Sequence, residues 1–320
     1  MIERMSRWVP PMILATSALT GCSLGLDALT FDRDPDGGQT TTGNGGNGGA
    51  TTSTTGQGGT AGAGGAGTTS TTSTGGGGTG GAGGSCAPLG ALSDDFGSAA
   101  TLSNWQLLST VEQTMVRHDL LDIDTTTPGQ LTMRPTPTAM NGWFAQNQGP
   151  FLYKQVTGNF LVAARVSAGV EADANTAPTH TFNTAGLLVR KTGAAPANWL
   201  LIDLGFQDPS DAGIGNLAVG ALGKTTLNDV TTRTALAGSH QGWLGICRIG
   251  DTFALIRKLD NELNPQVLLQ ANRPDLGATV QVGMIAGSWI AAQRDVVGRF
   301  DSIRFSEPKT PLDCEACLME

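Results

Sequence analysis

Residues 86–320 are predicted to fold as an all-β domain, a sandwich of two antiparallel sheets. Three observations support this prediction. Apolar residues alternate with polar ones in short runs, turn-forming residues recur between the runs, and no stretch has the apolar spacing of a helix of three turns or more. Alternation with a period of two places one set of side chains on the buried face of a sheet. Many short strands separated by turns are typical of antiparallel sandwiches.

The alternating runs give the order of the predicted strands. The clearest runs lie at 159–166, 185–189, 253–255 and 280–284. Glycine, proline, asparagine and aspartate gather in turns between such runs, at 157–159, 193–198, 208–213, 249–251 and 273–277. In the last run the alternation slips between Phe300 and Ile303, which predicts a β-bulge or a strand buried on both faces. Trp105 and Trp243 lie within apolar runs and are predicted to be core residues.

Residues 1–21 have the features of a bacterial lipoprotein signal peptide. Arg4 and Arg7 precede an apolar run that is shorter than the roughly 20 residues needed to span a bilayer. The run ends in Leu19-Thr20-Gly21-Cys22, which resembles the lipobox of bacterial lipoproteins. This resemblance implies that Cys22 becomes the new N-terminus and carries acyl chains, palmitate among them, which anchor the protein in a membrane. The alternative is an ordinary signal peptide with a cysteine at that position by chance.

The same resemblance bears on localisation, because Ser23 stands where the inner-membrane retention signal of lipoproteins has aspartate. It implies a lipid-anchored protein of the cell envelope, at the outer membrane or cell surface.

Residues 22–85 are predicted to be a disordered tether. From 37 to 85 the chain is almost entirely glycine, threonine, serine and alanine, without charge or proline. Such a segment buries too little apolar surface to offset its conformational entropy.

Several short motifs of the domain, taken in order, resemble a known family. They are 93–96 with Trp105, 149–154, 156–162, 185–190, 248–253, 280–283 and 299–301. The series resembles concanavalin A-like lectin/glucanase sandwich domains, and is similar to the C-terminal module of family 43 β-xylosidases and its uncharacterised relatives. The resemblance implies a jelly-roll fold more than an activity. Relatives often have an Asp-Gly turn and a tryptophan where this chain has 259–265, which puts ligand contacts in that hairpin in doubt.

No complete catalytic constellation is found, so the domain is predicted not to be an enzyme. Glucanases of this fold resemble one another in a Glu-x-Asp-x-Glu strand, whereas the nearest string here, Glu171-Ala172-Asp173, lacks the third acid. Asp122 and Asp124 are the alternative acidic pair, because they can share one strand face. The net charge of −8, without a basic cluster, argues against nucleic acid as a partner.

Four cysteines remain once Cys22 is lipidated: Cys86, Cys247, Cys314 and Cys317. An even number in an oxidising compartment predicts two disulfides, with three possible connectivities. First and last strands usually meet in the resembled fold. That resemblance favours Cys86 bonded to Cys314 or Cys317, with Cys247 taking the other.

The sequence predicts no cofactor apart from structural calcium, which accompanies many jelly rolls. The candidate ligands are Asp94, Asp95 and Asp301, whose hard oxygen atoms suit this ion and which lie on the predicted terminal strands. The alternative places Asp94 and Asp95 in exposed turns and pairs Asp301 with an arginine.

Tryptophan and amide side chains indicate where a ligand would bind. Trp143 lies beside Gln146 and Asn147, and Trp199 and Arg190 belong to neighbouring elements. Tryptophan stacks on the C–H face of a sugar while amides bind its hydroxyls. The leading hypothesis is a membrane-anchored lipoprotein that recognises a polysaccharide or other glycan without catalysis. The alternative is a structural or adhesion lipoprotein that binds protein partners, and a glycoside hydrolase is less favoured.

Overall fold

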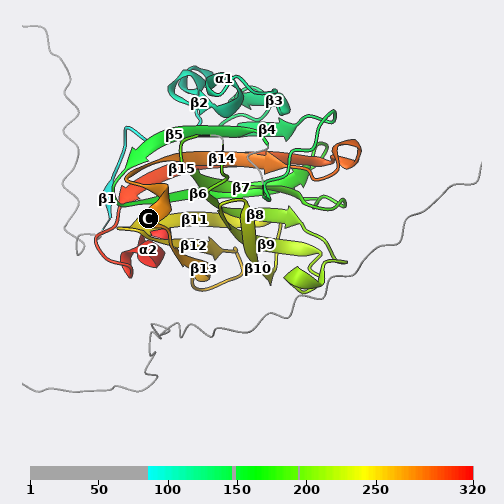
Figure 1. Ribbon diagram of the computed structural model, residues 1–320. Coiled ribbons are helices and arrows are strands. Elements are labelled where there is room, and N and C mark those ends of the chain that lie inside the picture. The colour runs from blue at the N-terminus through cyan, green and yellow to red at the C-terminus, as the bar shows by residue number, and fades with distance from the viewer. Residues whose placement is uncertain (1–85, 146–148, 194, 320) are drawn as a thin grey trace, which may run out of the picture. The chain divides into compact units, whose positions relative to one another are not determined.

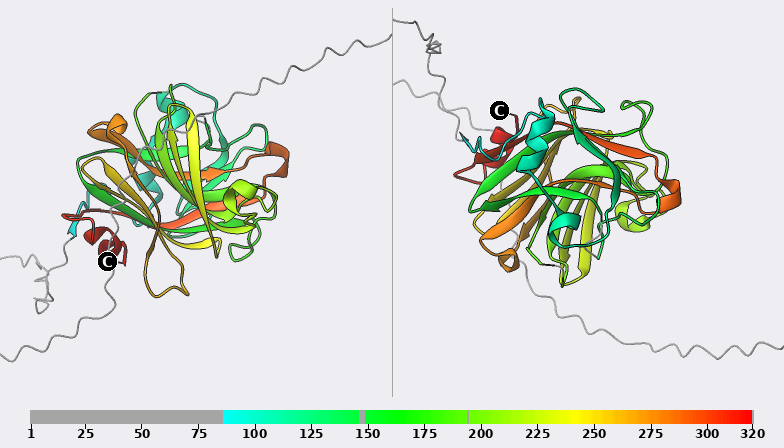
Figure 2. Two further views of the ribbon diagram at one scale, coloured as in Figure 1. Left: turned by 60° about the horizontal axis from the view of Figure 1, so that its bottom comes forward. Right: turned by 90° about the horizontal axis from the view of Figure 1, so that it is seen from above.

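The computed structural model describes residues 86–145, 149–193 and 195–319. The predicted signal peptide, Cys22, the tether, Gln146 and Asn147 lie outside the described residues. Within the described part, the strands form two antiparallel sheets that face one another, as predicted (Figures 1 and 2). Helices are short there, and none has the length and hydropathy needed to cross a membrane.

Sheet A has the strand order β13-β12-β11-β6-β15-β4-β3, with β1 paired to β15. Its strands are β1 (Ala87–Pro88), β3 (His118–Ile123), β4 (Leu131–Pro135), β6 (Phe160–Val170), β11 (Gln241–Ile249), β12 (Thr252–Lys258), β13 (Gln266–Asn272) and β15 (Val296–Glu307). Sheet B has the order β10-β9-β8-β7-β14-β5-β2. Its strands are β2 (Gln106–Leu107), β5 (Phe151–Thr157), β7 (Asn183–Arg190), β8 (Trp199–Phe206), β9 (Val219–Leu227), β10 (Val230–Ala237) and β14 (Thr279–Gly287).

Short helical turns connect some of these strands. The α-helical turns are α1 (Leu108–Val111) and α2 (Asp313–Ala316). The 3-10 turns are η1 (Ala99–Asn104), η2 (Ala212–Ile214), η3 (Pro274–Leu276), η4 (Ala291–Gln293) and η5 (Cys317–Met319).

The core lies between the two sheets and follows the predicted alternation. Phe160, Val162 and Val166 of β6 are buried in this core. The alternate residues of β14 are buried in it as well, namely Val280, Val282, Met284 and Ala286. Trp105 belongs to this core, as expected. Trp243 does not: it is half-buried on the outer face of sheet A, where the Arg304 guanidinium lies 4.5 Å from its ring. An apolar run alone could not distinguish the two faces of its strand.

The predicted irregularity in the last strand is a β-bulge. The register of β15 against β6 shifts between Phe300 and Ile303, and both of these side chains are fully buried. The bulge allows both to face the core although they are three residues apart, while Asp301 between them is exposed.

Two disulfides hold the C-terminal segment: Cys86–Cys317 joins the two ends of the domain, and Cys247–Cys314 ties the segment to β11. The expected arrangement is confirmed, and the structure decides which of the two C-terminal cysteines pairs with Cys86. The C-terminal segment packs on the outer face of sheet A, where Leu318 is fully buried against Leu161. The start of the domain at β1 and its C-terminal end therefore lie at the same end of the sandwich (Figure 1).

Candidate functional site

A pocket lies on the outer face of sheet B. Its lining includes loop residues at one end of the sandwich, and β1 and the C-terminus lie at the other end (Figure 1). Four interstrand loops meet at the first of these ends, at 136–150, 171–182, 207–218 and 288–295. Each contributes at least one residue to the pocket or to its edge. The antiparallel topology explains this, because every second connection in a sandwich falls at the same end.

Sheet B forms the floor of the pocket. Thr184, Leu201, Asp203, Lys224 and Ile285 line it from four neighbouring strands. The register places Lys224 directly opposite Leu201, and Leu222, two residues before it, opposite Asp203. All of these side chains alternate with core residues along their strands, so they share the outer face of the sheet.

Three aromatic side chains, one from each of three loops, form an aromatic wall. The ring of Trp289 lies 6.1 Å from that of Phe144 and 6.2 Å from that of Phe182, nearly perpendicular to both. Gly142 allows this packing, since a Cβ atom there would lie 2.6 Å from the Trp289 indole. Trp289 is half-buried, so part of it remains accessible to a ligand.

Two ion pairs add polar groups to this mainly apolar pocket. Lys224 Nζ lies 3.3 Å from Asp203 Oδ2 and donates a hydrogen bond to the Trp143 carbonyl at 3.3 Å. Gln207 donates to the other carboxylate oxygen of Asp203 at 3.0 Å. Arg233 pairs with Asp211, and its guanidinium lies 5.5 Å from the Phe144 ring. Two acidic and two basic side chains line the pocket, so their formal charges sum to zero.

The cavity volume is about 200 Å³. Pockets for drug-sized ligands measure roughly 300–1,000 Å³. The space therefore suits a small ligand, comparable with one sugar ring, that has both apolar and polar faces.

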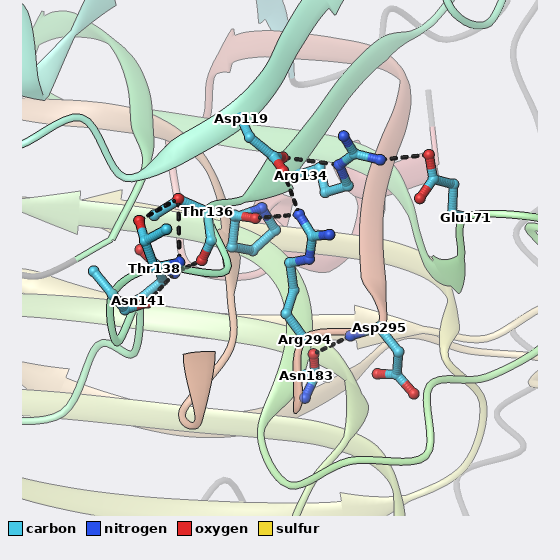
Figure 3. Close-up of polar contacts among 11 residues, drawn as sticks. Asp119, Arg134, Thr136, Thr138, Asn141, Glu171, Asn183, Arg294 and Asp295 are labelled. Atoms are coloured by element: carbon cyan, nitrogen blue, oxygen red, sulfur yellow. Dashed lines mark hydrogen bonds and ion pairs between the residues drawn. The ribbon is translucent and has the colours of Figure 1, made fainter. Parts of the chain in front are cut away.

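A polar network ties the loops around the pocket to one another (Figure 3). Asp119 accepts hydrogen bonds from Arg134 at 2.8 Å and from Arg294 at 2.6 Å, and Arg134 also pairs with Glu171. These contacts connect β3 and β4 with the β6–β7 and β14–β15 loops. Burial by itself would raise the pKa of Asp119, but the hydrogen bonds from the two arginines outweigh it and hold that pKa below its usual value. The Asp119 carboxylate is therefore stabilised as the anion that links the two arginines.

Backbone contacts complete this arrangement. The Asn183 side-chain oxygen accepts a hydrogen bond from Asp295 N at 3.1 Å, and Asn141 N donates to the Ser288 carbonyl at 3.0 Å. Asn141 also donates from its side chain to the Thr136 carbonyl at 2.7 Å (Figure 3). The three loops that carry the aromatic wall are thus held before any ligand arrives.

Of the tryptophans and the arginine predicted to contact a ligand, Trp143 lines the pocket, whereas Trp199 and Arg190 lie behind its lining. Trp199 and Arg190 have no exposed surface, and Trp143 is 2% exposed. The Trp143 ring packs edge-on against Phe151 and Trp199, with centroids 6.0 and 6.2 Å away. The Arg190 guanidinium pairs with Glu112 at 2.8 Å. Trp143 therefore lies at the pocket with little exposed surface, and the ligand contacts that we propose add Trp289, Asp203 and Lys224.

The sequence contains a weak signal for two of the pocket residues. Asp203 and Lys224 are single charges within otherwise apolar or neutral strand sequences, WLLIDLGF and VGALGKTTL. A lone charge at an outward position of a buried strand indicates that something polar covers it. Phe144, Phe182 and Trp289 come from three separate loops, and nothing in the sequence predicts that these loops meet.

The acidic residues considered for catalysis have local partners. Asp122 accepts hydrogen bonds from Thr126 N and Oγ1 at 3.0 and 2.6 Å, and Asp124 accepts one from Gly129 N at 2.8 Å. Both help to close the β3–β4 hairpin. Asp173 likewise accepts from Asn175 N at 2.9 Å within its own turn.

The candidate calcium ligands also have other partners. Asp94 accepts hydrogen bonds from Trp105 Nε1 and Phe96 N, both at 2.9 Å, and Asp95 accepts one from Gly97 N at 3.0 Å. Asp301 lies 3.5 Å from the Arg165 guanidinium. Among the described residues, no three histidine, cysteine, aspartate or glutamate side chains form a metal-binding group. Calcium binding remains a prediction.

No protein-family model and no curated protein matches the sequence. By structure, the chain is similar to xylan β-1,4-xylosidase from Bacillus halodurans C-125, with a TM-score of 0.51 at 12% identity. It is also similar to a mutant of the GH43 protein BlXynB from Bacillus licheniformis, with a TM-score of 0.50 at 13% identity. Each match covers 67% of this chain and 39% of the other. A lectin from Bauhinia forficata in complex with GalNAc has a TM-score of 0.42 at 7% identity, over 67% of this chain and 97% of the lectin.

The chain therefore spans well under half the length of these xylosidases. Identities this low show a shared fold and nothing finer. The fold is the predicted concanavalin-like sandwich.

Proposed function

We propose that the domain recognises a carbohydrate, without cleaving it, in the pocket on the outer face of sheet B. The observation that carries this proposal is the half-buried Trp289 ring beside a buried Asp203–Lys224 ion pair. Sugar rings have apolar C–H faces that pack on aromatic rings and hydroxyl groups that bind charged or amide groups. The pocket offers both within one small volume.

The charges of the pocket support binding rather than hydrolysis. The two carboxylates that line the pocket, Asp203 and Asp211, are each paired with a cation. Glycoside hydrolysis requires one carboxyl group that is protonated and a second that acts as nucleophile or base. Each of these two carboxylates is instead engaged by a cation from a neighbouring strand or loop contact.

Trp289→Ala is expected to weaken glycan binding at least tenfold, because the substitution removes the accessible aromatic face of the pocket. The full chain carrying Cys22→Ser, which prevents lipidation, would be screened on a glycan array and its hits quantified by calorimetry. Trp243→Ala is the matched control, since it removes a half-buried tryptophan from the outer face of sheet A. No binding by the folded parent protein would contradict the proposal and favour the protein-binding alternative. Equal losses in both variants would also contradict it.

We further propose that lipid on Cys22 anchors the protein in the outer membrane. The sequence Leu19-Thr20-Gly21-Cys22, which resembles a lipobox, supports this proposal.

Cys22→Ser is expected to abolish incorporation of labelled palmitate and to move the protein from the membrane fraction to the soluble fraction. Only a lipidated cysteine explains both effects, since the acyl chains provide the anchor. Gel autoradiography of fractionated cells measures both, and Ser23→Ala serves as the control with unchanged labelling. Labelling that persists in Cys22→Ser would contradict the assignment.

A further inference from the structure

We infer that the pocket binds the terminal residue of a neutral glycan, with two adjacent ring hydroxyls bridging Asp203 and Lys224. This inference rests on the proposed carbohydrate recognition and specifies its ligand. Three properties of the pocket support it: its enclosure, its unused hydrogen-bonding capacity and its charge balance.

The pocket is bounded on several sides rather than open as a groove. Trp289 and Phe182 come from the loops at the end of the sandwich, Phe144 comes from the β4–β5 loop, and Arg233 lies on β10. An internal residue of a polysaccharide has a neighbour at each end and needs two exits from its site. A cavity of about 200 Å³ lined by all these elements has room for a single ring and not for its neighbours on both sides.

The buried ion pair has spare hydrogen-bonding capacity. The two hydrogen-bonding contacts of Lys224 Nζ, to Asp203 Oδ2 and to the Trp143 carbonyl, are 3.3 Å long, and Nζ also lies 5.7 Å from the centre of the Phe182 ring. Strong N–H···O bonds measure about 2.7–3.2 Å, and an ammonium group has three donors. A carboxylate has roughly four lone-pair sites, and Asp203 has one firm partner in Gln207.

Two adjacent hydroxyls match this arrangement. One hydroxyl donates a hydrogen bond to the Asp203 carboxylate, and the other accepts one from the Lys224 ammonium. The ligand thus supplies shorter hydrogen bonds to two groups whose mutual contact is long. Hydrogen bonds to charged groups are among the stronger ones in proteins. Their loss in an analogue would leave a buried charge poorly solvated.

The charge balance selects a neutral ring. Asp203 with Lys224 and Asp211 with Arg233 already compensate one another. A uronic acid or sugar phosphate would bring an uncompensated negative charge close to Asp203, away from bulk water.

The test uses calorimetry on the full chain with Cys22→Ser. The probes are methyl glycosides of glucose, galactose, mannose and xylose, the matching uronic acids, and oligosaccharides of two to six residues. We expect one neutral methyl glycoside to compete fully with its oligosaccharides, with dissociation constants within about threefold of one another, and the matching uronic acid to bind at least tenfold more weakly. Deoxy analogues lacking either of two adjacent hydroxyls should also bind at least tenfold more weakly.

Ligand analogues report on the contacts without any change to the protein, so misfolding does not obscure the result. Affinity that rises with chain length, with no competition by any methyl glycoside, would overturn the terminal-residue inference and leave carbohydrate recognition standing. Preference for a uronic acid, or equal binding of the deoxy analogues, would overturn the bridging of Asp203 and Lys224. No binding of any saccharide by the folded protein would overturn both proposals.

Discussion

Replacing Cys86 and Cys317 together by serine is expected to lower the free energy of unfolding by about 5 kcal/mol. This disulfide links residues 231 positions apart. In the chain-entropy model, cross-linking such distant residues removes much of the conformational freedom of the unfolded chain. The first strand, β1, has two residues, and the backbone of Leu89 and Asp94 adds hydrogen bonds to β15 beyond it.

Urea unfolding followed by tryptophan fluorescence measures this loss. The comparison variant replaces Cys247 and Cys314, whose bond links residues 67 positions apart. Its loss is expected to be smaller, about 4 kcal/mol, because the closed loop is shorter. A loss under about 1 kcal/mol for the longer loop would show that the stabilisation does not come from restricting the unfolded chain.

Lys224→Met is expected to destabilise the domain by about 3–5 kcal/mol. Asp203 is 1% exposed, and Lys224 is the cation that neutralises it in the structure. Methionine fills similar space but leaves the carboxylate buried without its cation, and an unpaired buried charge is costly. Chemical unfolding of the single variant at neutral pH measures the effect.

A double variant separates the ion pair from packing. Asp203→Asn combined with Lys224→Met removes both charges and should recover at least half of the lost stability. Arg233→Met is the matched control, because its partner Asp211 is partly exposed and the loss should be about 0–1 kcal/mol. A double variant as unstable as the single one would show that Lys224 contributes through its packing and not its charge.

These effects depend on structural features that the sequence predicted to different degrees. The strand pattern and the slip between Phe300 and Ile303 were predicted from local rules, and the family resemblance favoured a bond from Cys86 to Cys314 or Cys317 without deciding between them. They follow from side-chain alternation and from the fold that the motifs resemble. Trp243 shows the limit of such rules, because an apolar run does not reveal which face of its strand is covered.

The sequence predicted the types of side chain in the candidate site, but it did not predict most of the residues that form it. The sequence indicated tryptophan and polar groups for a sugar, but pointed to Trp143 and Trp199, which the structure buries. Both have polar or small neighbours in sequence, and their burial comes from residues distant in sequence, such as Trp199 for Trp143.

By itself, then, the sequence determined that this domain is a two-sheet sandwich, because hydrophobic periodicity acts between residues that are neighbours in the chain. The tertiary structure alone decided where the pocket lies. Phe144, Phe182 and Trp289 are brought together by loops that the order of the strands places at one end, and Asp203 meets Lys224 across two paired strands. Such contacts depend on which strands pair and in what register, and this information is spread over the whole chain.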